Sequence, residues 1–154
     1  MRLKYLRKTL WERILAAAPK PDLDVPMEED VYHIMGTIHL ATLLADRRGI
    51  DREVATAAML LHDIGRVVTG RVDGHAEAGA ELARELLAEV GFTPAETDEI
   101  CQAIATHVRK AETGTPLEEL VRDADVLEVY LSGAPLPPVF VARVEGMKRE
   151  LGLV

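Results

Sequence analysis

Histidine and aspartate residues give this chain its clearest chemistry. His62 and Asp63 are adjacent at the end of the apolar run AAMLLHDIGR. A mixed set of imidazole and carboxylate ligands suits iron, manganese, zinc or nickel better than calcium or magnesium. The same pair could instead end a helix, as a cap and a partner of the helix dipole. Further candidate ligands lie where a helical chain could bring them around this pair, which favours a metalloenzyme: His33, His75, His107 and Asp125.

His33 and His39 belong to one predicted helix but to different faces of it. Six positions of an α-helix separate two side chains by about 120° around the axis. His33 points toward the apolar stripe of its helix, and His39 lies on the other side of that stripe. At most one of the two is therefore a primary ligand. We expect His39 to be a structural residue at the edge of the core, or a substrate-binding residue of the pocket.

The segments that position these side chains have the pattern of an all-α protein. Apolar residues recur mostly at helical spacing, and aromatic residues, which favour strands, make up only 4% of the chain. The helix that ends at His62 is dense in alanine and leucine, so we expect it to be central and to carry the His–Asp pair. Gly65, Gly70 and Gly74 predict a loop over residues 65–75. Helices are expected over residues 2–18, 30–48 with Asp30 as its cap, 51–62, 78–90, 94–110, 117–131 and 138–151.

The chain is long enough for one well-packed domain. We divide that unit into an N-terminal amphipathic helix, residues 1–20, and a metal-binding helical domain, residues 21–154. The first twenty residues contain six basic side chains and one acidic one. Such a helix can lie on an anionic membrane or dock its leucine face onto its own domain or a second subunit. Docking is the preferred interpretation, with Trp11 as the anchor, and a homo-oligomer is one form it could take.

Charge and cysteine content set further expectations. The net charge of −8 argues against binding of a nucleic acid polymer, because phosphate chains need a cationic surface. The single cysteine, Cys101, cannot form an internal disulfide and is expected to pack as a small hydrophobe. The N-terminus has no secretory signal pattern, so we expect a cytoplasmic protein. No uncharged stretch approaches the roughly 20 residues that span a bilayer, so no membrane span is expected.

In order along the chain, the candidate ligands resemble the pattern of the HD superfamily (HDIG type) of metal-dependent phosphohydrolases. The resemblance covers residues 30–131 and rests on six residues in matching helical contexts, within segments such as AAMLLHDIGR, GHAEAGAELA, AIATHV and VRDADVLEVY. It implies a single-domain HD-type helical bundle. It also implies that His33, His62, Asp63 and Asp125 hold a first divalent metal. His75 and His107 would hold a second, bridged to the first by Asp63.

The resemblance further implies hydrolysis of a phosphomonoester or phosphoanhydride in a nucleotide or similar small metabolite. A hydroxide bridging the two metals would be the nucleophile. Arg66 stands where the family has lysine and would bind phosphate oxygens, with Arg109 and Lys110 as secondary candidates. Glu77 would orient His75 or handle a proton. Two alternatives remain open: an HD-type di-iron oxygenase, and a non-catalytic regulatory module that binds a nucleotide.

Overall fold

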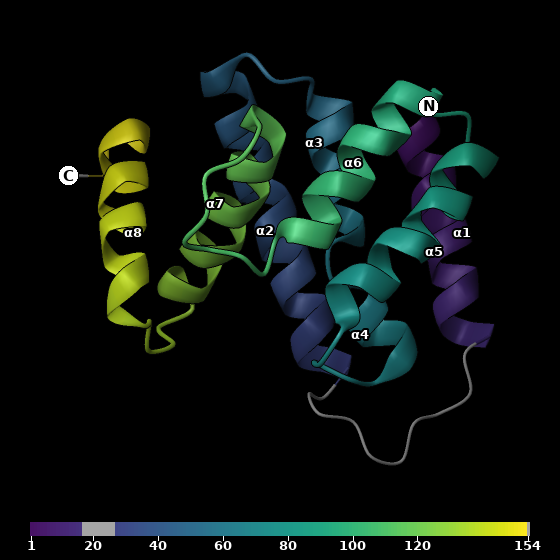
Figure 1. Ribbon diagram of the computed structural model, residues 1–154, viewed down its shortest axis with the longest axis horizontal. Helices are drawn as coiled ribbons and strands as arrows, with labels where there is room; N and C mark the ends of the chain where they lie inside the picture. The colour runs from purple at the N-terminus through teal and green to yellow at the C-terminus, as the bar shows by residue number, and fades with distance from the viewer. Residues whose placement is uncertain (17–26, 154) are drawn as a thin grey trace.

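Helices account for all regular secondary structure in the part of the chain that the structure, a computed structural model, describes: residues 1–16 and 27–153. The fold is all-α, as predicted (Figure 1). In chain order the helices are α1 (Arg2–Ala16), α2 (Met27–Arg48), α3 (Arg52–Leu61), α4 (Ile64–Thr69), α5 (His75–Glu89), α6 (Pro94–Thr106), α7 (Pro116–Leu131) and α8 (Pro138–Leu151).

Local sequence signals fix the starts of three of these helices. The Asp51 side chain accepts hydrogen bonds from the first backbone amides of α3, as expected for an N-cap. Helices α6 and α7 begin with capping boxes, in which Thr93 pairs with Glu96 and Thr115 with Glu118. Both of these helices have proline at the first position, where its missing N–H costs nothing. These three helices all carry or adjoin candidate ligands.

Helix α3 is the central helix, as its composition predicted. Every residue from Val54 to Leu61 is buried, and α3 contacts α1, α2, α5, α6 and α7. At 25 cal/mol per Å² of apolar surface, each fully buried leucine contributes about 2 kcal/mol of hydrophobic stabilisation. His62 follows directly at the C-terminal end of α3 and is completely buried. A rigid, fully packed element therefore holds the His–Asp pair.

The structure corrects three predicted boundaries. The segment expected to be a loop contains α4, whose C-cap is Gly70 with φ 75°, a left-handed conformation that favours glycine. Helix α2 begins before Asp30, so Asp30 is no cap but a buried residue within the helix. Helix α6 ends at Thr106 instead of Lys110.

Gly65 explains why α4 packs so closely on α5. A Cβ atom at this position would lie 2.0 Å from the backbone oxygen of His75 and 2.7 Å from the backbone nitrogen of Gly79. Only glycine permits this approach of the two backbones. The contact lies at the start of α5, where His75 is the first helical residue. Gly65 thus helps to place a candidate ligand.

Helix α1 docks onto its own domain through its leucines. Leu6 and Leu10 are buried in the common core, where α1 packs on α3 and α5. Trp11 is 53% exposed, so the anchor expected there is instead supplied by the two leucines. The predicted domain boundary near residue 20 lies outside the described residues. Cys101 is buried in the core, as predicted.

Helix α8 contacts the rest of the fold through ion pairs. The guanidinium of Arg143 in α8 lies 2.5 Å from Asp123 of α7 and donates a 3.0 Å hydrogen bond to the backbone oxygen of Lys110. Arg48 of α2 contacts the same aspartate at 2.7 Å. The hydrogen bond from Arg143 connects α8 to the segment between α6 and α7 that carries Lys110. Among the described residues, no helix is long and apolar enough to cross a membrane.

Candidate metal centre

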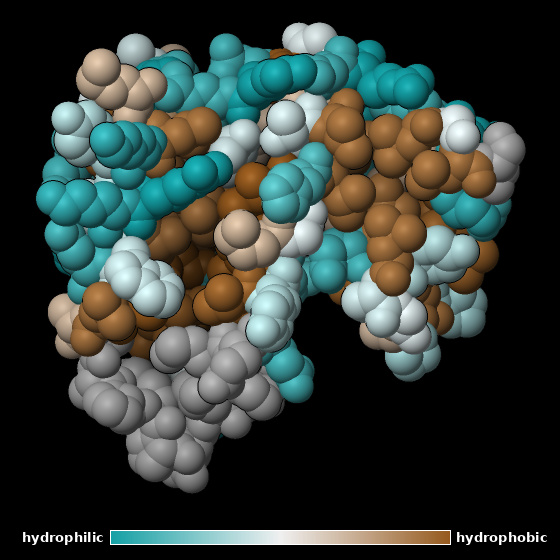
Figure 2. Space-filling model, turned by 180° about the vertical axis from the view of Figure 1, so that it is seen from behind, coloured by the Kyte–Doolittle hydropathy of each residue, from teal (hydrophilic) through white to brown (hydrophobic). Residues whose placement is uncertain are grey.

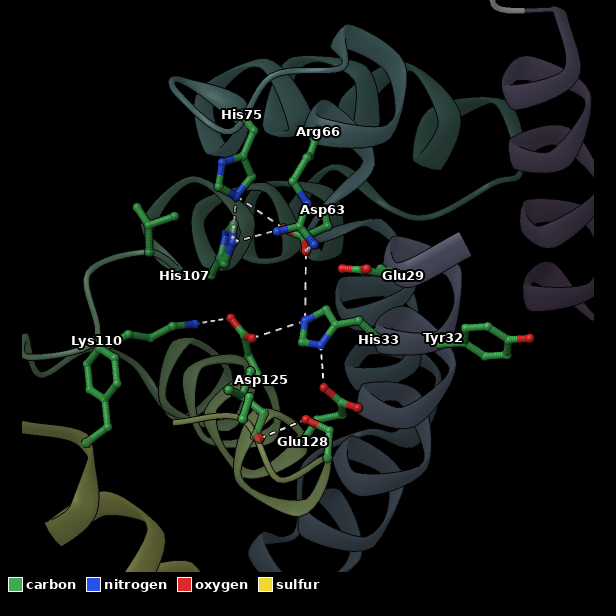
Figure 3. A pocket seen from close by; sticks show the side chains of 15 residues that line it. Glu29, Tyr32, His33, Asp63, Arg66, His75, His107, Lys110, Asp125 and Glu128 are labelled. Carbon is green, nitrogen blue, oxygen red and sulfur yellow. Dashed lines mark hydrogen bonds and ion pairs between the residues drawn. The ribbon is translucent and has the colours of Figure 1, made fainter. Parts of the chain in front are cut away.

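Five of the six candidate ligands line one pocket (Figure 3), and the sixth, His62, is buried behind it next to Asp63. Two sets of potential ligand atoms each lie within 4.8 Å of one another, and Asp63 belongs to both sets. One set is His33, His62 and Asp63, and the other is Asp63, His75 and His107. Asp125 of α7 adjoins the first set, with Oδ1 3.1 Å from Nε2 of His33. All six ligands expected from the sequence are thus brought together.

Asp63 divides its two oxygens between the two sets. Its Oδ2 atom lies 3.4 Å from Nε2 of His62 and 3.8 Å from Nε2 of His33. Its Oδ1 atom lies 3.1 Å from Nε2 of His75 and 3.4 Å from Nε2 of His107. Asp63 therefore directs one carboxylate oxygen toward each group of imidazoles.

The four histidines all present the same ring nitrogen to Asp63. The Nδ1 atoms of His62, His75 and His107 lie 2.5–2.8 Å from the backbone oxygens of Met59, Val72 and Ile104. Each of these Nδ1 atoms therefore donates its proton to a carbonyl, three residues earlier in the chain in every case. In a neutral imidazole this tautomer leaves a lone pair on Nε2. The backbone thus prepares each Nε2 to coordinate a metal.

The four histidines form two pairs in which the Nε2 atoms face each other closely. The Nε2 atoms of His75 and His107 are 3.1 Å apart, and those of His33 and His62 are 3.3 Å apart. When both rings of a pair are neutral, their Nδ1 protons are already donated elsewhere, so the two Nε2 lone pairs face each other and repel. A cation shared by each pair removes this repulsion. The residues present therefore fit a centre that holds divalent metal.

The ionised carboxylates at the centre also favour the binding of cations. Burial lowers the pKa of His62 to about 4, so this ring is neutral at pH 7 and able to coordinate. Burial also lowers the pKa of His33, but Asp125, Glu128 and Asp63 outweigh it and raise that pKa to about 9. Burial raises the pKa of Asp63, yet its histidine and arginine neighbours hold it well below its usual range. The pocket thus stabilises positive charge next to ionised carboxylates.

Glu128 of α7 is a part of the centre that was not predicted. Its Oε2 atom lies 2.5 Å from Nδ1 of His33 and accepts the proton that the backbone accepts for the other three histidines. The signal in the sequence was its position three residues after Asp125, on the same face of α7. Gly36 leaves room for it, since a Cβ there would lie 2.7 Å from Cγ of Glu128.

Arg66 and Lys110 are the basic side chains at the pocket. Arg66 lies 2.7 Å from Oδ2 of Asp63 and 2.6 Å from Oδ1 of Asp30. Lys110 contacts Oδ2 of Asp125. Asp30, expected as a cap, is instead the buried partner of Arg66, and burial raises its pKa. The sequence signal that could have indicated this role is the position of Asp30 one helical turn before His33.

The pocket has a volume of about 640 Å³ and an apolar rim. Val108, Val129 and Phe140 line it beside the polar centre, and Tyr32 stands at its edge with 77% of its surface exposed. In Figure 3 the Tyr32 ring points away from the ligands while Arg66, His75 and His107 point toward Asp63. The cavity can hold a small organic group next to the ligand atoms.

Three residues predicted to act at the site do not line this pocket. His39 is exposed on α2, away from the residues that line the pocket. Arg109 is exposed and forms an ion pair with Glu112 at 3.8 Å. Glu77 is exposed and lines a neighbouring hollow beside His75 instead. Each prediction relied on nearness in sequence to a ligand. Helix periodicity turns His39 and Glu77 outward, and Arg109 lies in the connection that follows α6.

The comparison with protein families decides the classification. The family model described as HD domain matches residues 30–130, a range that includes all six clustered ligands. This chain belongs to the HD domain family. The predicted resemblance is confirmed, and the family core begins within α2 and ends within α7.

Two curated relatives resemble the chain over two thirds or more of its length. Ribonuclease Y of Thermobifida fusca (strain YX) is 35% identical over 103 residues, which are 66% of this chain and 19% of the relative. Ribonuclease Y of Geobacter metallireducens is 34% identical over 125 residues, 79% of this chain and 22% of the relative. The chain thus spans about a fifth of the length of these curated relatives.

A solved structure has the same fold. The crystal structure of a predicted HD superfamily hydrolase from an uncultured Thermotogales bacterium matches with a TM-score of 0.64 and 28% identity. The match covers 95% of this chain and 75% of the other. The chain therefore has the fold of an HD superfamily hydrolase, including parts of it outside the family model.

One prediction of partners is wrong. The acidic net charge led us to exclude nucleic acid polymers, yet these relatives are named ribonucleases, enzymes of RNA. Net charge averages over the whole surface, whereas phosphate contacts depend on where cations gather. The average therefore gave no ground for restricting the HD domain to small substrates.

Proposed function

We propose that this HD-domain protein is a metal-dependent phosphohydrolase that cleaves a phosphate ester of a nucleotide. The convergence of four imidazole Nε2 atoms on the two oxygens of Asp63 is the observation that carries this proposal. Divalent metal at such a centre lowers the pKa of water and neutralises charge on a phosphoryl oxygen. The apolar rim of the pocket supports a substrate with an organic group beside its phosphate.

The residues of the chain have distinct tasks in this proposal. His33, His62 and Asp125 would hold one ion, and His75 and His107 a second, with Asp63 between them. Backbone carbonyls and Glu128 keep the imidazoles in the coordinating tautomer. Arg66 and Lys110 carry positive charge at the pocket, where a phosphate oxygen would lie. Burial of the centre strengthens each of these electrostatic contacts.

Metal content and phosphate release test the proposal together. We expect purified protein to contain close to two divalent ions per chain by elemental analysis, and to release phosphate from a panel of nucleotides. Asp63→Ala should lose both the metal and the activity. Asp98→Ala, which removes an exposed carboxylate on α6, should retain both. Activity that survives full removal of metal would overturn the assignment.

His75→Ala tests the second ion. Because His75 and His107 share only Asp63 with the first set of ligands, this change should remove about one ion and leave the other. Unchanged metal content would exclude the two-ion centre. The same reactions, run without dioxygen, separate a hydrolase from the di-iron oxygenase, which requires dioxygen and would stop.

RNA is the second candidate substrate, and the ribonuclease Y relatives are the observation that favours it. The metal centre could hydrolyse a phosphate ester either in a free nucleotide or in a nucleic acid polymer. Incubation of the metal-loaded protein with a labelled single-stranded RNA distinguishes the two. Cleavage of the RNA by the wild-type protein, but not by Asp63→Ala, would establish the polymer as a substrate.

A further inference from the structure

The outward face of α1 combines cations with exposed aromatic rings. Tyr5 and Trp11 are 55% and 53% exposed, and Lys4, Arg7 and Lys8 are exposed beside them. We call these five residues the α1 face. Figure 2 looks at the molecule from behind, with α1 along the left edge, where hydrophilic side chains predominate. The HD family model begins at residue 30, so the α1 face is additional to the family core.

Helix α1 is fixed in its rotation, so this face cannot turn inward. Leu6 and Leu10 are buried on the opposite side of the helix. At the first turn, Arg2 donates hydrogen bonds to Glu53 of α3 and to Glu96 of α6, at 2.8–3.1 Å. The docking predicted from the sequence therefore uses one side of α1 only. The opposite side remains available.

Cations stand between the aromatic rings on this face. At about 100° per residue, Lys4 and Lys8 fall between Trp11 and Tyr5 around the helix axis, and Arg7 flanks Trp11 on the other side. Within the described residues, Lys4 and Arg7 form no ion pair, and Lys8 has only Glu12 at 3.7 Å. Residues 2–16 contain five basic side chains and one acidic one, on a chain of net charge −8. Positive charge is thus concentrated here.

This arrangement matches one class of partner. Single-stranded nucleic acids bind to surfaces where cations contact phosphates and aromatic rings stack on bases. A helix that lies in a membrane instead needs a continuous apolar stripe. In α1 the leucine stripe is already buried in the core, and the lysines interrupt the exposed aromatic residues. The charge and the spacing therefore favour a nucleic acid strand over a lipid surface.

We propose that the α1 face binds single-stranded nucleic acid, with Lys4, Arg7 and Lys8 on the phosphates and Trp11 stacked on a base. This contact lies outside the metal centre and does not depend on hydrolysis. If hydrolysis fails but binding holds, only the proposed function is wrong. If a nucleotide is hydrolysed but no strand binds, only this inference is wrong.

Trp11 is the single tryptophan of the chain and so reports on its own contact. We expect its fluorescence to be quenched when an oligouridine of about 16 nucleotides is added to the intact protein in EDTA, which prevents turnover. Anisotropy of the labelled oligonucleotide gives the dissociation constant. Trp11→Ala should raise that constant about 5- to 150-fold, since stacking on one base is worth about 1–3 kcal/mol. The affinity should fall steeply with added salt.

Two matched charge reversals complete the experiment. Lys4→Glu should weaken binding severalfold, whereas Arg149→Glu, an equal change at an exposed position of α8, should leave it nearly unaltered. If both variants lost the same affinity for the oligonucleotide, net charge alone would explain the effect and the proposed site would be overturned. Absence of binding to the oligonucleotide would overturn the proposed site as well. A Trp11 fluorescence change with phosphatidylglycerol vesicles in its place would indicate a lipid surface, and a change with protein concentration would indicate a second copy of the chain.

Discussion

The Nδ1 atom of His33 lies 2.5 Å from Oε2 of Glu128, so a carboxylate on α7 orients an imidazole on α2. The other three histidines of the centre use a carbonyl of their own local segment for the same purpose. His33 alone depends on a different helix. The orientation of this ring is therefore tied to the packing of α2 against α7.

Removal of that carboxylate should weaken metal binding without emptying the centre. Outer partners of metal-bound histidines typically contribute 10- to 100-fold in metal affinity. We expect Glu128→Ala to raise the dissociation constant for zinc or manganese by roughly that factor in calorimetric titration. Glu128→Gln should recover part of the loss, because its amide oxygen still accepts the Nδ1 proton. Glu29→Ala removes another carboxylate of the pocket and should bind metal normally; a loss equal to that of Glu128→Ala would contradict the orienting role.

Gly65 should be intolerant of any side chain. A Cβ atom there would meet the backbone of His75 at 2.0 Å, and backbone cannot move aside as a flexible side chain can. We expect Gly65→Ala to lower the free energy of unfolding by about 3 kcal/mol in urea titrations. Gly146→Ala is the matched control: it lies within α8, with nothing within 4 Å of the added Cβ. Because alanine favours helix, this control should gain about 0.5–1 kcal/mol. Similar stability of the two variants would disprove the close-contact explanation.

The contact between Arg2 and Glu96 makes the docking of α1 dependent on pH. Hydrogen bonds from Arg2, and then from Thr93, lower the pKa of Glu96 from 4.5 to about 2. A carboxylate whose pKa is depressed by folding stabilises the folded state above its unfolded pKa, and this stabilisation is lost as the pH falls. Arg2→Ala should therefore melt below the wild type at pH 7, and the difference should shrink between pH 4.5 and 2. Melting curves by circular dichroism check this. A difference that grows toward low pH would show that Glu96 is not the relevant partner.

The all-α fold and the clustering of the six candidate ligands could be predicted, because local patterns indicate the helices and the family resemblance indicates the residues. Helical periodicity and the caps at Asp51 and Thr93 indicate where helices begin. The family pattern gives the order of the ligands, which lie in segments that such helices can bring together. His62 and His107 each follow directly after a helix, so they inherit their positions from well-packed elements.

What the sequence did not reveal depends on contacts between helices. The burial of Asp30 against Arg66 and the approach of Glu128 to His33 require the relative placement of α2, α4 and α7. Helix α4 forms where three glycines predicted a loop, because Gly65 allows a backbone contact with α5. His39 and Glu77 illustrate the opposite limit: they are close in sequence to candidate ligands, but they do not line the pocket.

The centre draws its side chains from α2, α5, α7 and the ends of α3 and α6, so a bound ion would cross-link most of the helical bundle. Ligands that bind only the folded state raise its stability in proportion to the logarithm of their concentration over the dissociation constant. Thermal denaturation of the stripped protein, repeated with manganese, iron, nickel and zinc, can consequently rank the ions by the size of the shift, before any substrate has been found.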